Sequence, residues 1–175
     1  MPNWCENELI IVGPSDKVQK FLEAAGVEGK TPLSFQRLRP VPQEFLQSDG
    51  WYRWRVVNWG TKWDVDGEGD VLILDDLYAD GIRRVGMSFS TPWGPPDCLF
   101  RFVAPQHPDL TFELRYDMSY DDHRGALRLR GDAILEEDPK YPATYASMTD
   151  ALLAVLEGDD FYNPLEDDEE DDDDD

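Results

Sequence analysis

The amino-acid sequence predicts an α+β fold in which two helices cover one face of a largely antiparallel β-sheet. Short apolar runs that end at glycine or proline alternate with segments of helical periodicity, a pattern typical of this class. The chain has 175 residues, of which 41% are hydrophobic and 12% aromatic, enough to bury one core. There is no run of about 18 apolar residues, and no charged-then-apolar leader precedes the first strand. We therefore expect a soluble, cytoplasmic protein.

The N-terminal part predicts a strand followed by a helix. Trp4 to Val12 ends in the run Leu-Ile-Ile-Val and is closed by a Gly-Pro pair, as expected of a buried strand. Ser15 or Asp16 can cap a helix that Gly26 stops. The apolar residues of this helix recur at i, i+3, i+4 and i+7, and they are Val18, Phe21, Leu22 and Ala25.

The next segment predicts a second strand and an aromatic insertion. Residues 33–38 begin by alternating and run into prolines, so we expect a strand that leaves the sheet there, with a short helical turn over 43–46. Four of the six tryptophans then fall between Trp51 and Trp63. Two extended runs, 71–78 and 82–90, meet at an Asp-Gly pair and predict a β-hairpin. We assign the insertion to about residues 43–81.

The C-terminal part predicts a helix, two strands and a last helix. Pro95 and Pro96 introduce a helix whose apolar stripe is Leu99, Phe102 and Val103. Residues 110–118 follow as a strand, residues 126–131 alternate as an edge strand with a basic outer face, and residues 148–156 form a terminal helix. The element order predicts a ferredoxin-like split βαβ sandwich with a Trp-rich insertion, an extra edge strand and a C-terminal helix, in one domain over residues 1–162.

Four separated motifs resemble those of a known family. They are Met-Pro-Asn-Trp-Cys-Glu-Asn-Glu-Leu at 1–9, Leu-Arg-Pro-Val-Pro at 38–42, Asn-Trp-Gly-Thr-Lys-Trp-Asp at 58–64 and Phe-Ser-Thr-Pro-Trp-Gly-Pro-Pro at 89–96. In this order they resemble the Api92-like or YubB ferredoxin-like proteins of phages, plasmids and bacteria, over roughly residues 1–118. The resemblance implies a ferredoxin-like fold and an uncharacterised function, and it brings no catalytic residue. The family's last motif usually reads Thr-Ala-Trp-Ser-Pro-Pro, whereas this chain has Pro92 and Gly94 around Trp93.

The charge of the chain is strongly negative and unevenly placed. It carries 38 acidic and 16 basic residues, a net charge of -22, and ten of the acidic residues form the run 166–175. Like charges in such a run repel one another and bury nothing, so residues 163–175 are expected to be a disordered acidic tail. The overall field disfavours direct binding to nucleic acid or a phosphate surface, and we expect no membrane association. A basic protein is a possible partner.

Indole rings beside polar side chains predict a binding surface. Trp4, Trp59, Trp63 and Trp93 lie next to turn-forming or amide residues, where their rings could stack an extended ligand or hold a cation. Polar groups nearby could orient such a ligand, so the predicted binding residues are Trp4, Asn58, Trp59, Lys62, Trp63, Asp64 and Trp93. The alternative is that these indoles form a secondary core that joins the insertion to the sheet.

Other constellations give weaker alternatives. Residues 64–75 approach the spacing of a calcium-binding loop but end in Asp75 instead of glutamate, which favours a solvated acidic turn. Cys5 and Cys98 are expected to be small core residues in a reducing compartment. No cofactor or metal site is expected, because His107 and His123 lack ligand spacing.

Three classes of function follow from these features. The first is a non-enzymatic binding or protein-interaction module with a Trp-rich contact surface and an acidic tail that tunes association. The second is an acidic inhibitor that mimics nucleic acid and acts on a DNA- or RNA-handling protein. The third is a small enzyme that uses the amine of Pro2 or the thiol of Cys5.

Overall fold

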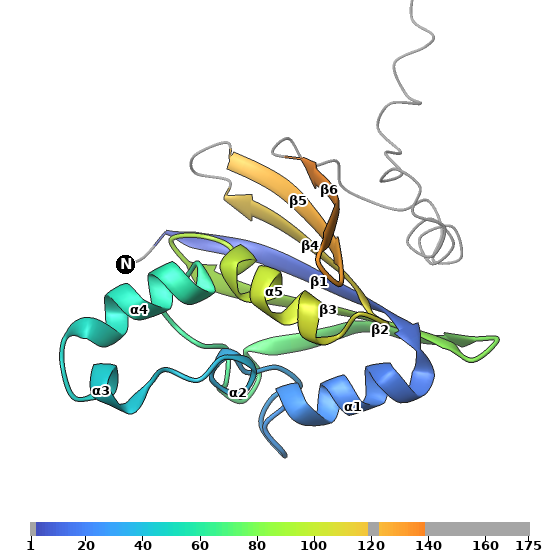
Figure 1. Ribbon diagram of the computed structural model, residues 1–175, viewed down its shortest axis with the longest axis horizontal. Helices are drawn as coiled ribbons and strands as arrows, with labels where there is room; N and C mark the ends of the chain where they lie inside the picture. The colour runs from blue at the N-terminus through green and yellow to red at the C-terminus, as the bar shows by residue number, and fades with distance from the viewer. Residues whose placement is uncertain (1–2, 119–122, 139–175) are drawn as a thin grey trace, which may run out of the picture.

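The computed structural model describes residues 3–118 and 123–138 and forms a mixed α+β structure around one six-stranded sheet (Figure 1). The strand order is β2-β3-β1-β4-β5-β6, and every neighbouring pair is antiparallel. The strands are β1 (Trp4–Pro14), β2 (Val71–Ala79), β3 (Ile82–Pro92), β4 (Thr111–Met118), β5 (His123–Arg130) and β6 (Ala133–Asp138). The helices are α1 (Ser15–Ala25), α2 (Phe35–Leu38), α3 (Gln43–Leu46), α4 (Gly50–Trp59), α5 (Asp97–Val103) and the 3-10 turn η1 (Ala104–Gln106). Within the described residues, no helix is long and apolar enough to cross a membrane.

Strand β1 is the centre of the sheet, as its apolar run predicts. It pairs with β3 on one side and with β4 on the other. Because side chains alternate along a strand, Leu9 and Ile11 point to one face, and Ile10 and Val12 point to the other. Leu9 and Ile11 belong to the main hydrophobic cluster, whereas Ile10 and Val12 form a separate small one.

Figure 1 shows the helices beside the sheet. Their buried side chains belong to the same cluster as Leu9 and Ile11. Helix α1 contributes Val18, Phe21 and Ala25, as its periodicity predicts. Helix α5 contributes Leu99, Phe100 and Val103, so the expected stripe was wrong in one position. Phe102 is 40% exposed, and Phe100 is fully buried in its place, next to Leu99 and Val103.

The strand predicted over residues 33–38 is wrong, because this segment contains helix α2. The carboxylate of Asp64 accepts hydrogen bonds from the backbone N–H of Phe35 at 2.5 Å and of Gln36 at 2.8 Å, and from the Ser34 hydroxyl at 2.9 Å. These bonds satisfy the first N–H groups of the helix. In a strand, the same groups would donate to the backbone of a neighbouring strand. Strand β2, inside the expected insertion of residues 43–81, lies at the edge of the sheet next to β3.

The prediction that residues 126–131 form an edge strand is also wrong. Strand β6 pairs along the outer side of β5, so among the described strands β2 and β6 form the edges. The turn at Gly131 has φ of +56°, which glycine adopts easily and which returns the chain for this extra pairing. Of the two arginines of the expected basic outer face, Arg128 is only 1% exposed, whereas Arg130 is exposed.

The hairpin predicted at residues 71–90 is confirmed. Asp80 and Gly81 both have positive φ, 51° and 81°, as the short turn between β2 and β3 requires. The predicted helix at 148–156, the tail at 163–175 and Pro2 lie outside the described residues.

Candidate functional site

Trp59 belongs to the core and not to the binding surface that was predicted for it. Its side chain is fully buried, and its ring packs edge-to-face against Phe35 with 5.8 Å between the ring centroids. The indole N–H donates a hydrogen bond to the backbone carbonyl of Arg39 at 2.9 Å. Trp59, at the end of α4, belongs to the main hydrophobic cluster around Leu9 and Ile11, so it is a core residue but not part of a secondary core.

Trp4 and Trp63 come together at the surface, as the binding hypothesis predicts. Trp4 begins β1 and Trp63 lies in the loop before β2, and their ring centroids are 6.2 Å apart. The two side chains are 44% and 38% exposed. They line a groove of about 500 Å³. We call this the indole groove, and its lining residues are Trp4, Glu6, Trp63, Asp64, Val65, Gly69, Asp70, Ser90 and Pro92.

The charged side chains that line the described part of the indole groove are all acidic. The Glu6 carboxylate accepts a hydrogen bond from the Ser90 hydroxyl at 2.7 Å, across the paired strands β1 and β3. Asp70 accepts one from the backbone N–H of Gly67 at 3.0 Å. A carboxylate oxygen can accept more than one hydrogen bond, so both groups can also receive a donor from a ligand.

Asp64 and Lys62 both contact other groups of the same chain. Asp64 lines the groove, but its carboxylate accepts hydrogen bonds from backbone N–H groups at the start of α2 and from the backbone N–H of Val65. The Lys62 ammonium lies outside the groove lining, 4.8 Å from the centroid of the Trp63 ring and 5.3 Å from that of Tyr52. Trp63 is therefore already engaged by one cation from its own chain.

Trp93 and Asn58 lie outside the groove lining. Trp93 is 52% exposed and has φ of +71°, a left-handed conformation that is rare for a bulky residue. Its backbone N–H donates to the carbonyl of Asn3 at 2.9 Å, which ties this turn to the start of β1. The Asn58 amide donates to the Trp54 carbonyl at 2.8 Å within α4, so its role is local.

The two cysteines are free thiols that differ in burial. Cys5 is fully buried in β1, and its burial raises the pKa of the thiol to about 12. Burial also raises the pKa of the Cys98 thiol. Since the thiolate is the nucleophile, Cys5 is poorly suited to covalent catalysis at neutral pH. The expectation that Cys5 is a core residue is confirmed, whereas Cys98 is only half-buried.

The acidic residues between 64 and 75 have separate protein partners. Asp64 caps α2, and Asp75 forms an ion pair with Arg84 of β3. The first and last ligand positions of the calcium hypothesis are therefore already occupied. Within the described residues, no group of three or more His, Cys, Asp or Glu side chains is placed to hold a metal ion.

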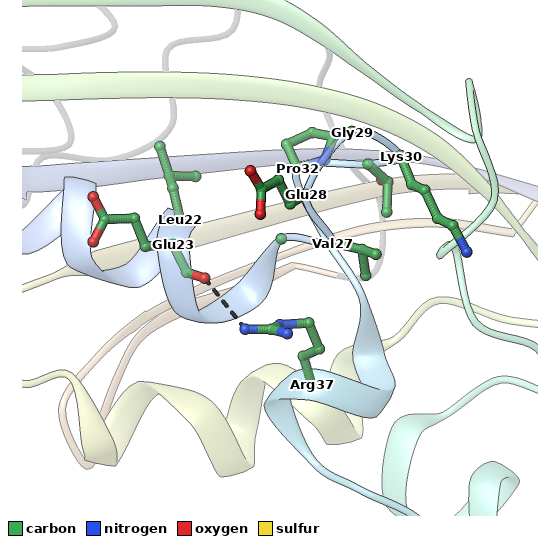
Figure 2. Close-up of a pocket in the computed structure, with 10 residues that line it drawn as sticks. Leu22, Glu23, Val27, Glu28, Gly29, Lys30, Pro32 and Arg37 are labelled. Atoms are coloured by element: carbon green, nitrogen blue, oxygen red, sulfur yellow. Dashed lines mark hydrogen bonds between the residues drawn. The ribbon is translucent and has the colours of Figure 1, made fainter.

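A second pocket, of about 640 Å³, lies at the C-terminal end of α1, and the sequence analysis did not anticipate it (Figure 2). It is formed by Leu22, Glu23, the loop at 26–32 and Arg37. The Arg37 guanidinium donates to the backbone carbonyls of Ala24 at 2.8 Å and Glu23 at 3.4 Å. The arginine thus satisfies carbonyls at the end of α1, which is a structural role. The apolar period of α1 gave no signal for this pocket.

Comparisons with known proteins find a similar structure but no similar sequence. A scan against protein-family models and a search of curated proteins find no match. Among solved structures, the chain is similar to the crystal structure of protein Api92 from Yersinia pseudotuberculosis, which is assigned to a domain family of unknown function. The TM-score is 0.59 at 9% sequence identity, with 83% of this chain and 100% of that chain covered. At this identity the similarity shows a shared fold.

Proposed function

We propose that this protein is a non-enzymatic binding module that takes up a cationic side chain of a basic protein partner in the indole groove. The observation that carries the proposal is the Trp4–Trp63 pair, whose half-exposed rings lie 6.2 Å apart beside carboxylates. Aromatic faces attract cations through their quadrupole, and each such contact contributes roughly 0.5–2 kcal/mol. Glu6 and Asp70 lie within the same groove and would add charge-assisted hydrogen bonds.

The charge of the whole chain supports the same class of ligand. A net charge of -22 accelerates encounter with a basic segment and repels an acidic one. Lys62 shows the chemistry within the chain itself, because its ammonium lies 4.8 Å from the centroid of the Trp63 ring. An arginine or lysine of a partner would meet the same kind of ring at Trp4, with free carboxylate oxygens within reach.

The proposal extends to fold and ancestry. We infer a ferredoxin-like split βαβ core, since the order β2-β3-β1-β4, with α1 before β2 and α5 before β4, is the order of that fold. We also infer a distant relationship to the Api92-like proteins, supported by the four sequence motifs and by the similar structure. The two free thiols support a reducing compartment, and we propose a cytoplasmic location.

A direct test uses a glycine-spaced arginine peptide and the same peptide with glutamate in place of arginine. Binding is measured by tryptophan fluorescence and calorimetry on the full chain. We expect the arginine peptide to bind with an affinity that falls as salt rises, and the glutamate peptide not to bind. Trp4→Ala and Trp63→Ala should each weaken binding about two- to thirtyfold, the equivalent of one cation–ring contact. Trp93→Ala is the matched control, because this exposed indole lies outside the groove lining.

The alternative, an acidic inhibitor that mimics nucleic acid, gives a different result. A mimic would keep its partner when either groove indole is removed. It would lose that partner when the ten carboxylates of residues 166–175 are replaced by their amides. Loss of peptide binding in Trp93→Ala as large as in Trp63→Ala would contradict the groove hypothesis.

A further inference from the structure

Strand β2 has an open edge. It pairs with β3 along one side, and no strand in the described part of the chain pairs with its other side. Along such an edge, every second residue directs its backbone N–H and C=O away from the sheet, where they can pair with another strand. Four large apolar side chains of β2 are also 47% to 61% exposed, and they are Leu72, Ile73, Leu74 and Tyr78. The edge therefore offers both backbone hydrogen bonds and apolar contact.

This edge lacks the features that usually keep a strand from pairing with another chain. Its sequence, Val-Leu-Ile-Leu-Asp-Asp-Leu-Tyr-Ala, contains no lysine or proline. Its two carboxylates are neutralised within the sheet, because both pair with arginines of β3. Asp75 forms an ion pair with Arg84, and Asp76 accepts two hydrogen bonds from the Arg83 guanidinium at 2.8 and 2.9 Å. A register irregularity leaves Leu74 without a partner on β3, so this bulge adds an exposed leucine to the edge instead of a charge.

The edge of β2 leads directly to the indole groove. Gly69 and Asp70 line that groove and immediately precede Val71, the first residue of β2. In the register with β3, Asp70 comes at the level of Ser90, which also lines the groove. A strand added antiparallel to β2 would continue past Val71 and run alongside Asp70. Because neighbouring strands lie about 4.8 Å apart, a basic side chain at that level would reach the Asp70 carboxylate.

The charges around the edge favour a basic partner over a second copy of this chain. Residues 66–80 contain six carboxylates and no lysine or arginine. If two copies paired antiparallel through this edge, the Asp70 end of one would meet the Asp80 end of the other, so carboxylates would face carboxylates. Each copy also carries a net charge of -22. A basic segment meets the same carboxylates with opposite charge, and this complementarity identifies the occupant.

We propose that the edge of β2 binds an extended segment of a basic protein as an additional antiparallel strand, and that the cationic residues following this strand enter the indole groove. The inference rests on the proposed function of the groove and adds the conformation of the partner to it. The segment would be a short run of apolar and β-branched residues, which covers Leu72, Ile73 and Leu74, followed by arginine or lysine. Backbone hydrogen bonds would give such a complex its affinity, and the basic residues would give it specificity.

Two peptides separate strand addition from binding in the groove alone. The strand peptide has six alternating valine and threonine residues, then glycine and two arginines, and the proline peptide has proline at every second position of the same run. Both peptides carry the same charge, but the proline peptide cannot form the backbone ladder. In calorimetry on the full chain, we expect the strand peptide to bind at least about tenfold more tightly. Equal affinities would overturn strand addition but leave cation binding in the groove intact.

Amide hydrogen exchange followed by NMR locates the bound peptide. We expect the strand peptide to slow the exchange of β2 amides by about tenfold or more, with α1 unchanged. Leu72→Lys should weaken binding of the strand peptide about fivefold or more, because it replaces an apolar contact by a like charge. Val57→Lys is the matched control, since Val57 is 63% exposed on α4 and the change in charge is the same.

Three further outcomes decide between the proposal and its alternatives. Protection of β6 instead of β2, or equal losses in the two lysine variants, would overturn the proposal. Protection of β2 without peptide that disappears on dilution would assign the edge to a second copy and overturn it as well. Binding that protects β2 but is unaffected by Trp63→Ala would support the added strand and refute its extension into the groove, together with the proposed function.

Discussion

Replacing Trp59 by alanine should destabilise the protein by about 4–6 kcal/mol, whereas Trp63→Ala should cost less than about 1 kcal/mol. Trp59 is fully buried against Phe35 and Trp54, so its removal leaves a large cavity. Loss of a buried tryptophan side chain costs about 3–5 kcal/mol. The Arg39 carbonyl also loses its indole donor, which adds about 1 kcal/mol.

Urea unfolding followed by circular dichroism measures this difference. With a denaturant slope of about 2–3 kcal/mol per molar, the midpoint of Trp59→Ala should fall by roughly 1.3–3 M. Trp63→Ala is the matched control from the same segment and is 38% exposed. Equal midpoint shifts in the two variants, or a loss below about 1.5 kcal/mol for Trp59→Ala, would refute the division of the indoles into a core and a groove.

Further predictions concern single interactions. Asp64→Ala should cost about 1–2 kcal/mol in urea unfolding because α2 loses its cap, and Asp64→Asn should cost less; equal losses would argue against capping. Burial lowers the pKa of His107, so the folded state favours its neutral form; stability should decline as pH falls through about 6.5, and the decline should be smaller in His107→Gln. An aromatic disulfide reagent should label Cys98 in the folded protein and Cys5 only on unfolding, because the thiol of Cys5 is buried and its pKa is about 12. Trp93→Gly should raise the unfolding free energy by about 0.5–1 kcal/mol relative to Trp93→Ala, since glycine adopts φ of +71° without strain.

The sequence predicted those elements whose signals are local. The apolar run of β1, the period of α1 and the Asp-Gly turn at 80–81 each specify their structure within a few residues, and the structure agrees. Helix α2 was missed because its cap is the Asp64 carboxylate, which lies 29 residues from Phe35 in the chain. Strand β6 was missed because its sequence, Ala-Ile-Leu-Glu-Glu-Asp, becomes a strand by pairing with β5.

Only those parts of the candidate site that have a local sequence signal were predicted. Tryptophan beside turn-forming residues correctly suggested that some rings reach the surface, and Trp4 and Trp63 do so together. Nothing in the local sequence distinguishes Trp63 from Trp59, although Trp59 ends α4 and Trp63 lies in the loop that follows. At the end of α4 the ring of Trp59 is buried, whereas in the loop that follows the ring of Trp63 is partly exposed. The acidic partners Glu6 and Asp70 were not anticipated, because they come from strands and loops that are distant in sequence.

The junction at Gly60 makes the Trp-rich segment inseparable from the rest of the fold. Gly60 has φ of +91°, and a Cβ built there would lie 2.5 Å from the backbone carbonyl oxygen of Pro95, so α4 and the start of α5 meet backbone to backbone. A substitution at this glycine would push apart two helices and, with them, the loop that carries Trp63. For the proposed ligand, the groove-lining positions Glu6, Asp70 and Ser90 are the places where a new side chain would alter recognition without disturbing this junction.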